Sequence, residues 1–310
     1  MYFKYTSAIR DAIVRRISHP DYRLLECVRL LHSESHLLRI DMFGKVLAIY
    51  WYPERLPLAN EQKVFDTIAE FVHAERWVLF PKQKISIPDS SFLKESFAWH
   101  AKEHEIIYEL RSCHGASPGL FLDQRQQRLW TLENAFGKKV LNLFCYTSGF
   151  TLSALKGEAA QVCSVDTSAS ALAWSRDNLL LNGFSVKNSK FLKEDARSIL
   201  KRTLAKNGRY DIVVCDPPTF SRGKGAVFSL KREFRELLRA CCMIVAPGGD
   251  LLFSTNYEGI SHTEFHEIIS AEVASRAAAD VVFYKPTYDY VAKADWELKS
   301  ARISFSSEST

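Results

Sequence analysis

Three carboxylates in the second half of the chain are placed where they could bind a nucleoside. Asp166 and Asp216 end short apolar runs, and Asp195 follows the short strand predicted over residues 190–192. Such runs are typical of buried parallel strands, whose carboxyl ends meet along one edge of a sheet. A carboxylate at the tip of the second strand, here Asp166, can accept hydrogen bonds from both hydroxyls of a ribose. The pattern therefore predicts one ligand-binding crevice.

The segment 140–149 predicts the first strand and first turn of this crevice. Its beginning is apolar apart from Asn142, and it ends in the small residues Thr147, Ser148 and Gly149. Small residues let the backbone approach a ligand closely. The segment lacks the Gly-x-Gly-x-x-Gly pattern that cradles the pyrophosphate of a dinucleotide. A cofactor with an adenosine but no pyrophosphate, such as S-adenosylmethionine, suits this turn better.

Four motifs follow one another along the chain: Gly119-Leu-Phe-Leu-Asp-Gln-Arg125, the corner from Asn142 to Gly149, Val165-Asp-Thr-Ser168 and Asp216-Pro-Pro-Thr-Phe220. In their residues and their order they resemble the motifs of a family of class I S-adenosylmethionine-dependent methyltransferases that modify large-subunit ribosomal RNA. One such motif is weak evidence, but four in the family's order are specific. The resemblance covers residues 119–305 and implies an α/β fold with a Rossmann-like, seven-stranded methyltransferase sheet.

The resemblance also implies how S-adenosylmethionine is bound. Asp166 is expected to hold the ribose, while Asp195 accepts from the adenine amino group. Thr167 and Ser168 lie beside the adenine, and Ala196 donates its backbone N–H. The residues expected around the methionine end are Asn142, Phe144, Tyr146, Thr147, Ser148 and Gly149, together with Asp123, Gln124 and Arg125 from the preceding loop.

The acceptor site is expected at the fourth strand. Asp216 and the carbonyl of Pro217 can accept hydrogen bonds from the edge of a base, and Phe220 can stack on it. Because methyl transfer from a sulfonium is a direct displacement, the enzyme mainly aligns the acceptor with the methyl group. We therefore assign Asp216, Pro217 and Phe220 as the catalytic residues, with Asp216 also facing the cofactor.

The residues after the fourth and fifth strands indicate which atom is methylated. Carbon 5 of a pyrimidine is a poor nucleophile and needs a covalent cysteine adduct. The cytosine-C5 branch of the resembled family places that cysteine where Thr255 stands here, and other C5 enzymes place it near Thr219. The guanine-N7 branch shows Asp-Pro-Pro-Thr-Phe-Ser, a lysine-containing loop and Phe-Ser-Asn-Asn. This chain, with Lys224 and Phe253-Ser-Thr-Asn256, resembles the N7 branch more closely.

The placement of charge indicates RNA as a partner. The net charge is +5, and residues 1–110 carry equal numbers of acidic and basic residues, so the surplus lies in residues 111–310. The basic segment 187–209 reads as a solvated helix face. The basic segment 222–239 follows the expected acceptor pocket, where phosphate contacts make physical sense. The RNA-binding residues expected there are Arg222, Lys224, Lys231 and Arg232.

Composition limits the class of protein. The chain has 310 residues, of which 47% are hydrophobic and 25% charged, so it can bury a sizeable core. We see neither an apolar run long enough for a membrane nor a signal peptide. Seven irregularly spaced cysteines indicate reduced thiols and a cytoplasmic location. His262 and His266 are four residues apart but lack an evident third ligand, so no metal is expected.

Two domains are expected, divided at the Gly- and Pro-containing segment 115–119. We predict that residues 1–115 form a small α+β domain that positions the substrate RNA, and that residues 116–310 form the methyltransferase domain. Arg29-Leu-Leu-His-Ser-Glu34 and Ile40-Asp-Met-Phe-Gly44 resemble the small domain that precedes the catalytic domain in the same family. Within the second domain, a helix over 228–245 and a strand over 250–254 are predicted.

The resulting hypothesis is methyl transfer from S-adenosylmethionine to a base nitrogen of RNA, with guanine N7 of 23S ribosomal RNA favoured. Two alternatives remain open. One is a methyltransferase that acts on a small molecule or a protein. The other is an RNA-binding protein with a degenerate cofactor site, which Ser148 supports because it replaces the commoner glycine of the corner. The sequence does not indicate the oligomeric state.

Overall fold

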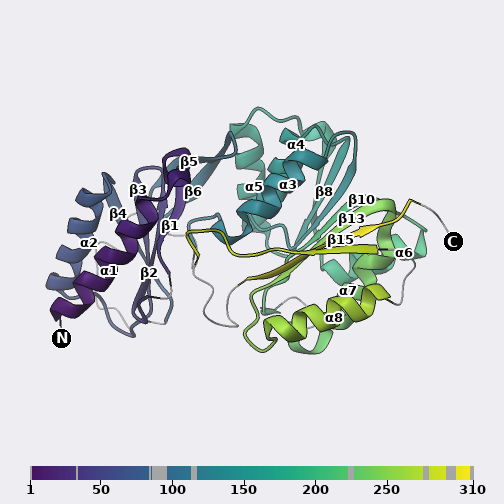
Figure 1. Cartoon of the computed structure of the whole chain (residues 1–310). Helices are drawn as coiled ribbons and strands as arrows, with labels where there is room; N and C mark the ends of the chain where they lie inside the picture. The colour runs from purple at the N-terminus through teal and green to yellow at the C-terminus, as the bar shows by residue number, and fades with distance from the viewer. Residues whose placement is uncertain are drawn as a thin grey trace. The chain divides into compact units, whose positions relative to one another are not determined.

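The protein forms two compact units, and each is described here by itself (Figure 1). The first contains residues 1–125 and 286–291, and the second contains residues 126–285 and 292–310. The computed structural model describes residues 2–32, 34–83, 85, 96–112, 117–222, 227–274, 279–290 and 298–307, with side chains omitted for 2–6, 220–222, 227–232 and 279. The segment 286–291 joins the first unit from far along the chain, which no sequence pattern indicated. The functional division between residues 1–115 and 116–310 stays a prediction.

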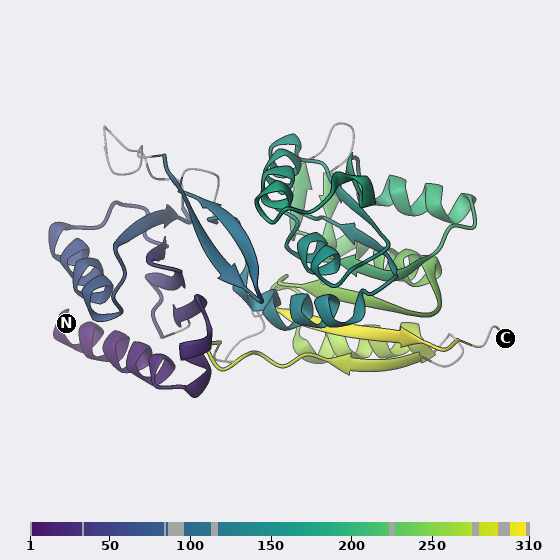
Figure 2. The ribbon, with the colours of Figure 1, turned by 90° about the horizontal axis from the view of Figure 1, so that it is seen from above.

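The first unit is built on a four-stranded sheet in the order β1-β2-β3-β4. The first three strands are antiparallel, and β3 pairs with β4 in parallel. A separate two-stranded ribbon is formed by β5 and β6 (Figure 2). The bounds are α1 Tyr2–Ile17, η1 Pro20–Leu24, β1 Cys27–Leu31, β2 Leu38–Phe43, β3 Val46–Trp51, α2 Ala59–Phe71, β4 Arg76–Pro81, β5 Ala98–Glu103, β6 Ile106–Arg111 and η3 Leu122–Gln124.

Alternation along the strands gives this sheet two different faces. Ile40 and Ile49 pack in one buried cluster with Ile13 of α1 and Phe65 of α2. Side chains of neighbouring positions point to the other face, because the side-chain period of a strand is two. That second face carries polar residues, among them Arg39 and Asp41, as well as apolar ones.

The second unit contains the expected seven-stranded sheet, in the order β14-β15-β13-β10-β7-β8-β9. The strands from β13 to β9 are parallel, while β15 runs antiparallel to both β13 and β14. This confirms the predicted fold class. The strand bounds are β7 Lys139–Leu143, β8 Gln161–Asp166, β9 Ser189–Lys193, β10 Tyr210–Cys215, β13 Val245–Thr255, β14 Ala279–Phe283 and β15 Lys299–Phe305.

Helices cover both faces of this sheet, as apolar runs without alternation require. Leu141 and Val213 belong to the cluster that includes residues of α6, α7 and α8. Val140 and Val214 belong to another cluster, which includes Ala154 of α4. Figure 1 shows α7 and α8 on the opposite side of the sheet from α4. The helix bounds are α3 Arg125–Asn134, α4 Gly149–Lys156, α5 Ala169–Leu181, η4 Val186–Asn188, α6 Ala196–Ala205, α7 Leu230–Ile244 and α8 His262–Ala274.

Two predicted elements have different bounds in the structure. A short hairpin of β11 Phe220–Arg222 and β12 Val227–Ser229 precedes α7, so that helix begins two residues later than predicted. The strand predicted over 250–254 begins earlier, at Val245. Gly249 lies where a Cβ atom would come within 2.7 Å of the carbonyl oxygen of Asp211. The lack of a side chain at Gly249 therefore lets β13 lie close to β10 in a segment whose sequence predicts a turn.

Candidate active site

The carboxyl ends of three parallel strands lie in register at the candidate site. Leu143 of β7 lies opposite Val165 of β8 on one side and Cys215 of β10 on the other. The next residues in sequence, including Asp166 and Asp216, therefore flank the start of the turn that follows β7. The carboxyl edge of the sheet is where α/β folds of this kind bind ligands.

The turn after β7 alternates between ordinary and left-handed backbone. Phe144, Tyr146 and Ser148 have φ angles of 56°, 49° and 71°. Such angles are uncommon outside glycine and cluster at sites that grip ligands. The sequence reasoning identified these residues as cofactor contacts, but it did not predict this conformation.

Polar residues of α5 hold the turn in place, and the sequence reasoning missed them. Ser148 Oγ lies 2.8 Å from Ser175 Oγ, which itself lies 2.8 Å from the carbonyl oxygen of Tyr146. Asn178 Nδ2 donates to the carbonyl of Thr147 at 3.3 Å. Ser175 and Asn178 are buried and three positions apart on one helix face. A buried pair of polar residues at this spacing is the signal that could have revealed them.

Asn142 supports the turn from within the sheet. Its side chain is buried in β7 and donates to Thr151 Oγ1 of α4 at 3.0 Å. Thr151 Oγ1 in turn lies 2.7 Å from Ser164 Oγ of β8. These contacts tie β7, α4 and β8 together. The cofactor contact that we predicted for Asn142 stays a prediction.

Asp166 joins the turn to the second strand. Its Oδ2 accepts from the backbone N–H of Tyr146 at 2.9 Å, and its Oδ1 accepts from Ser168 at 2.8 Å. Burial raises the pKa of Asp166, and the backbone N–H groups of Ser168 and Tyr146 oppose that effect. Each carboxylate oxygen has a second lone pair, so Asp166 can still accept from ribose hydroxyls. Ser168 also caps α5, accepting from Ala171 N, while Thr167 is exposed.

Asp195 caps α6 and is held by an arginine that the sequence reasoning did not identify. It accepts from the backbone N–H of Arg197 at 2.8 Å and from the guanidinium through both oxygens, at 2.9 and 2.7 Å. Arg197 also donates to Glu233 of α7 at 2.8 Å. These bonds lower the pKa of Asp195, chiefly through the Arg197 side chain. Ala196, beside it, is buried.

The acceptor end is described in part. Asp216 is half-buried, Pro217 is buried, and Thr219 Oγ1 lies 3.5 Å from Asn256 Oδ1, so the loops after β10 and β13 meet. The roles of the other predicted residues stay predictions. The structure describes only the backbone of Phe220, Arg222, Lys231 and Arg232, and Lys224 lies outside the described residues.

Arg125, the first residue of α3, makes side-chain contacts within the first unit. Its guanidinium donates to Asp289 at 3.1 and 3.3 Å and to the carbonyl of Cys27, and lies 3.4 Å from Glu103. These contacts indicate an ion-pair role in that unit. Gln124 is buried and Asp123 is half-buried. The expected cofactor contacts of all three stay predictions.

The left-handed conformation of Ser148 leads to a prediction about Ser148→Gly. Glycine removes a steric penalty of roughly 1–2 kcal/mol, while loss of the hydroxyl removes a hydrogen bond of about 1 kcal/mol. We expect urea unfolding to change little and calorimetry to show S-adenosylmethionine affinity equal to or tighter than wild type. Ser148→Ala, which keeps the strain and loses the bond, is expected to be the less stable variant. A tenfold weaker cofactor affinity in Ser148→Gly would contradict this and give the hydroxyl a direct cofactor contact.

The strand ends, the left-handed turn and the carboxylates lie together at the carboxyl edge of an α/β sheet of the methyltransferase type. The protein family described as S-adenosylmethionine-dependent methyltransferase matches residues 83–297. The match covers more than half of the chain, which therefore belongs to this family. The expected cofactor, S-adenosylmethionine, and the expected reaction class, methyl transfer, are confirmed at the level of the family.

Two curated relatives carry names that refer to ribosomal RNA. Ribosomal RNA large subunit methyltransferase I of Aeromonas hydrophila is 35% identical over 176 residues, covering 57% of this chain and 44% of the relative. Ribosomal RNA large subunit methyltransferase K/L of Pseudomonas aeruginosa is 32% identical over 264 residues, covering 81% of this chain and 35% of the relative. The chain thus spans less than half the length of either relative, and it matches both at similar identity.

Solved structures share the fold. A methyltransferase complexed with SAH superposes with a TM-score of 0.79 at 23% identity, covering 96% of this chain and 81% of that one. The SAM-dependent methyltransferase from Agrobacterium tumefaciens gives a TM-score of 0.66 at 21% identity, covering 92% and 90%. At these identities the likeness concerns architecture, and it includes both units because the coverage extends over nearly the whole chain.

Two further findings concern the described part of the chain. Within it, no three His, Cys, Asp or Glu side chains gather in a way that could hold a metal ion. None of its helices has both the length and the apolar composition needed to cross a membrane.

Proposed function

We propose that this protein transfers the methyl group of S-adenosylmethionine to a base nitrogen of large-subunit ribosomal RNA, with guanine N7 as the favoured acceptor. Both curated relatives are named as ribosomal RNA large subunit methyltransferases, which supports the substrate class. Guanine N7 carries a lone pair and needs no general base, so alignment is the main requirement. The site of action is then the cytoplasm of the cell that makes the RNA.

The observation that carries the choice of a nitrogen is the burial of the cysteines. All six cysteines within the described ranges are buried, and C5 chemistry needs an accessible thiolate. Cys145 and Cys215, which end or follow strands at the site, both have a pKa raised by burial. A raised pKa keeps the thiol protonated at neutral pH, so neither group is suited to attack a base.

Thr255 gives a second argument against a C5 mechanism. It ends β13 at the position where the C5 branch has its cysteine, and its side chain is fully buried. Its Oγ1 accepts from the backbone N–H of Tyr257 at 3.1 Å, so the hydroxyl shapes the turn after β13. The next residue, Asn256, meets Thr219 from the other loop. A structural hydroxyl at this position fits a site that binds the acceptor without a covalent adduct.

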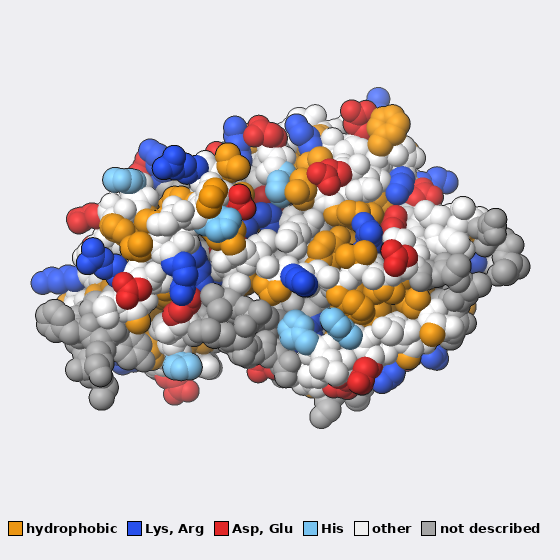
Figure 3. Space-filling view, viewed as in Figure 1, with side chains coloured by type: hydrophobic (Ala, Val, Ile, Leu, Met, Phe, Trp, Pro, Cys, Tyr) orange, Lys and Arg blue, Asp and Glu red, His pale blue; other side chains and the backbone are white. Residues whose placement is uncertain are grey.

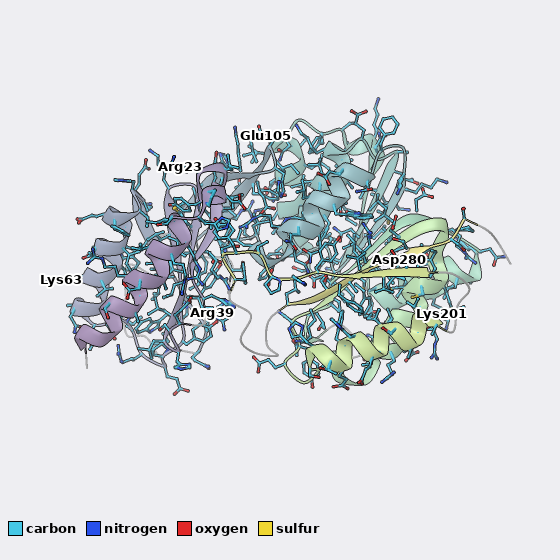
Figure 4. All side chains as sticks on the ribbon, viewed as in Figure 1. Arg23, Arg39, Lys63, Glu105, Lys201 and Asp280 are labelled. Atoms are coloured by element: carbon cyan, nitrogen blue, oxygen red, sulfur yellow. The ribbon has the colours of Figure 1, made fainter. Side chains whose placement is uncertain are left out.

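The test is mass-spectrometric nucleoside analysis of ribosomal RNA from cells with and without the gene. We expect one methylated nucleoside, 7-methylguanosine, to disappear in the deletion strain and to return with the wild-type gene. Asp216→Ala is expected not to restore it, because the acceptor loses a hydrogen-bond partner at the fourth strand. The matched control is Asp280→Ala, the same substitution at an exposed position of β14 (Figure 4).

Three outcomes separate the alternatives. Loss of 5-methylcytidine in place of 7-methylguanosine would place the protein in the C5 branch. An unchanged profile with intact S-adenosylmethionine binding would point to a small-molecule or protein substrate. An unchanged profile without cofactor binding would support an RNA-binding protein with a degenerate site.

A further inference from the structure

The four-stranded sheet of the first unit carries a group of cations on the face opposite its helices. Arg39 of β2 pairs across the strands with Tyr50 of β3, and Tyr50 pairs with Phe80 of β4. Ile40 and Ile49, the neighbours of Arg39 and Tyr50, lie in the helix-facing core. The alternation of strand side chains therefore places Arg39, Tyr50 and Phe80 together on the face opposite α1 and α2.

Three cations converge around one carboxylate on this face, and we call Arg29, Arg39 and Lys82 the basic cluster. Arg29 donates to both oxygens of Asp41, at 2.6 and 2.9 Å. Lys82 Nζ lies 4.5 Å from the centre of the Tyr50 ring, and the Arg29 guanidinium lies 5.9 Å from the same ring.

Aromatic rings line the rest of the basic cluster. The Arg39 guanidinium lies 5.2 Å from the ring of Tyr52, and that of Arg29 lies 4.6 Å from the ring of Tyr290. An aromatic ring attracts a cation that lies over its face, and Arg29, Arg39 and Lys82 are each half-buried. The cluster thus combines charge with aromatic surface, which is the combination that single-stranded nucleic acid binds.

The electrostatics of the cluster favour an added negative charge. Burial, with the positive charges of Arg29 and Arg39, lowers the pKa of Lys82 to about 8 against the attraction of Asp41. Burial also lowers the pKa of Arg39, and Arg29 adds to that effect, while Tyr52 and Asp41 oppose it. Like charges that are half-buried together disfavour their own charged forms. An anion placed between Arg39 and Lys82 would favour their charged forms and so raise the pKa of both groups.

We infer that the face of this sheet opposite α1 and α2 binds a phosphate group of the RNA backbone between Arg39 and Lys82. The inference rests on the proposed function, because RNA is the polyanion that a ribosomal RNA methyltransferase must hold. Arginine binds phosphate through paired N–H donors, and lysine supplies a compact charge. Acidic and basic side chains are interspersed over the face seen in Figure 3, among those described there.

The test measures binding of protein-free large-subunit ribosomal RNA to the full chain over a range of salt concentrations. In the double variant Arg39→Gln/Lys82→Gln we expect roughly tenfold weaker binding. The slope of log affinity against log salt should fall in magnitude by about 0.7, which is the change expected for the loss of one single-strand phosphate contact. The charge-conserving variant Arg39→Lys/Lys82→Arg is expected to keep most of that slope.

The matched control removes two basic residues elsewhere in the same unit. Arg10 and Lys63 are exposed on α1 and α2, and Figure 4 shows Lys63 pointing away from the sheet. Arg10→Gln/Lys63→Gln changes the net charge equally and is expected to keep the affinity and slope of wild type. Equal losses in both double variants would overturn the inference, because the effect would then be one of net charge. Inorganic phosphate added as competitor should weaken wild-type binding far less than unlabelled RNA.

A pH series gives an independent readout. Lys82 faces Arg29 of β1, Arg39 and Asp41 of β2, and Tyr50 of β3, and it loses its proton as pH rises through about 8. RNA affinity of the wild type should therefore fall between pH 7 and pH 9, and Lys82→Arg, which stays protonated, should flatten that fall. If Arg39→Gln/Lys82→Gln binds the RNA as tightly as wild type does, the phosphate site is refuted and the proposed function is left intact. Failure of wild type to methylate ribosomal RNA would refute the function separately, and failure to bind RNA at all would refute the site.

Discussion

Replacing Asp166 by alanine is expected to weaken S-adenosylmethionine binding by at least about a hundredfold, which is roughly 3 kcal/mol. Two losses combine. The ribose hydroxyls lose the acceptor that we propose for them, and the turn after β7 loses its bonds from Tyr146 and Ser168 to the carboxylate. Because Tyr146 has a left-handed backbone, the turn depends on such bonds to keep its shape. Isothermal titration calorimetry with the full chain measures the change.

The control for this variant is Asp177→Ala, the same substitution on the exposed side of α5. It should bind the cofactor like wild type. Asp166→Asn keeps the size of the side chain but replaces one acceptor oxygen by a donor, so a loss of cofactor affinity is expected here too. Wild-type affinity in Asp166→Ala would remove Asp166 from the cofactor site. The pKa of Asp166 is raised by burial, so cofactor affinity should also weaken as acidification protonates the carboxylate.

The sequence allowed the architecture of the second unit to be predicted because its strands are apolar runs with polar ends. Asp166 and Asp216 follow β8 and β10 as expected, and the register of the strands brings them to one edge. What the pattern could not indicate was how side chains from other elements would hold these groups. Arg197 comes two residues after Asp195 and reads as a surface cation, yet it binds that carboxylate and Glu233 together.

The ion pair of Arg125 was also not predicted, because its partner comes from another element of the fold. The motif that contains it suggests a ligand contact, because an arginine in a loop is usually exposed. Its partner Asp289 is 164 positions away in a segment without any periodic pattern. Only the three-dimensional structure shows that this segment belongs to the first unit. Long-range ion pairs leave no local sequence signal, whereas strands and helices do.

Loss of Asp289 should strongly destabilise the first unit. Its side chain is 0% exposed and accepts from Arg125, from the backbone N–H of Arg29 at 3.0 Å and from Thr287 at 2.6 Å. Asp289→Ala leaves a buried arginine with fewer partners, and breaking such a pair costs about 3–5 kcal/mol. Urea unfolding followed by tryptophan fluorescence measures the loss. The control is Glu75→Ala, which breaks an exposed pair with Lys45 and should change stability little.

The pH dependence of this stabilisation follows from the pKa of Asp289. Burial raises that pKa, but the charge and hydrogen bonds of Arg125, with those from Thr287 and Arg29, outweigh burial and lower it overall. A carboxylate with a lowered folded-state pKa contributes stability above its unfolded value of about 3.9. That contribution is lost as pH falls through the folded-state pKa. The difference between wild type and Asp289→Ala should therefore be full at pH 7 and shrink below about pH 4. A difference that is small at pH 7 would mean that Glu103, 3.4 Å from Arg125, suffices to hold the guanidinium in place.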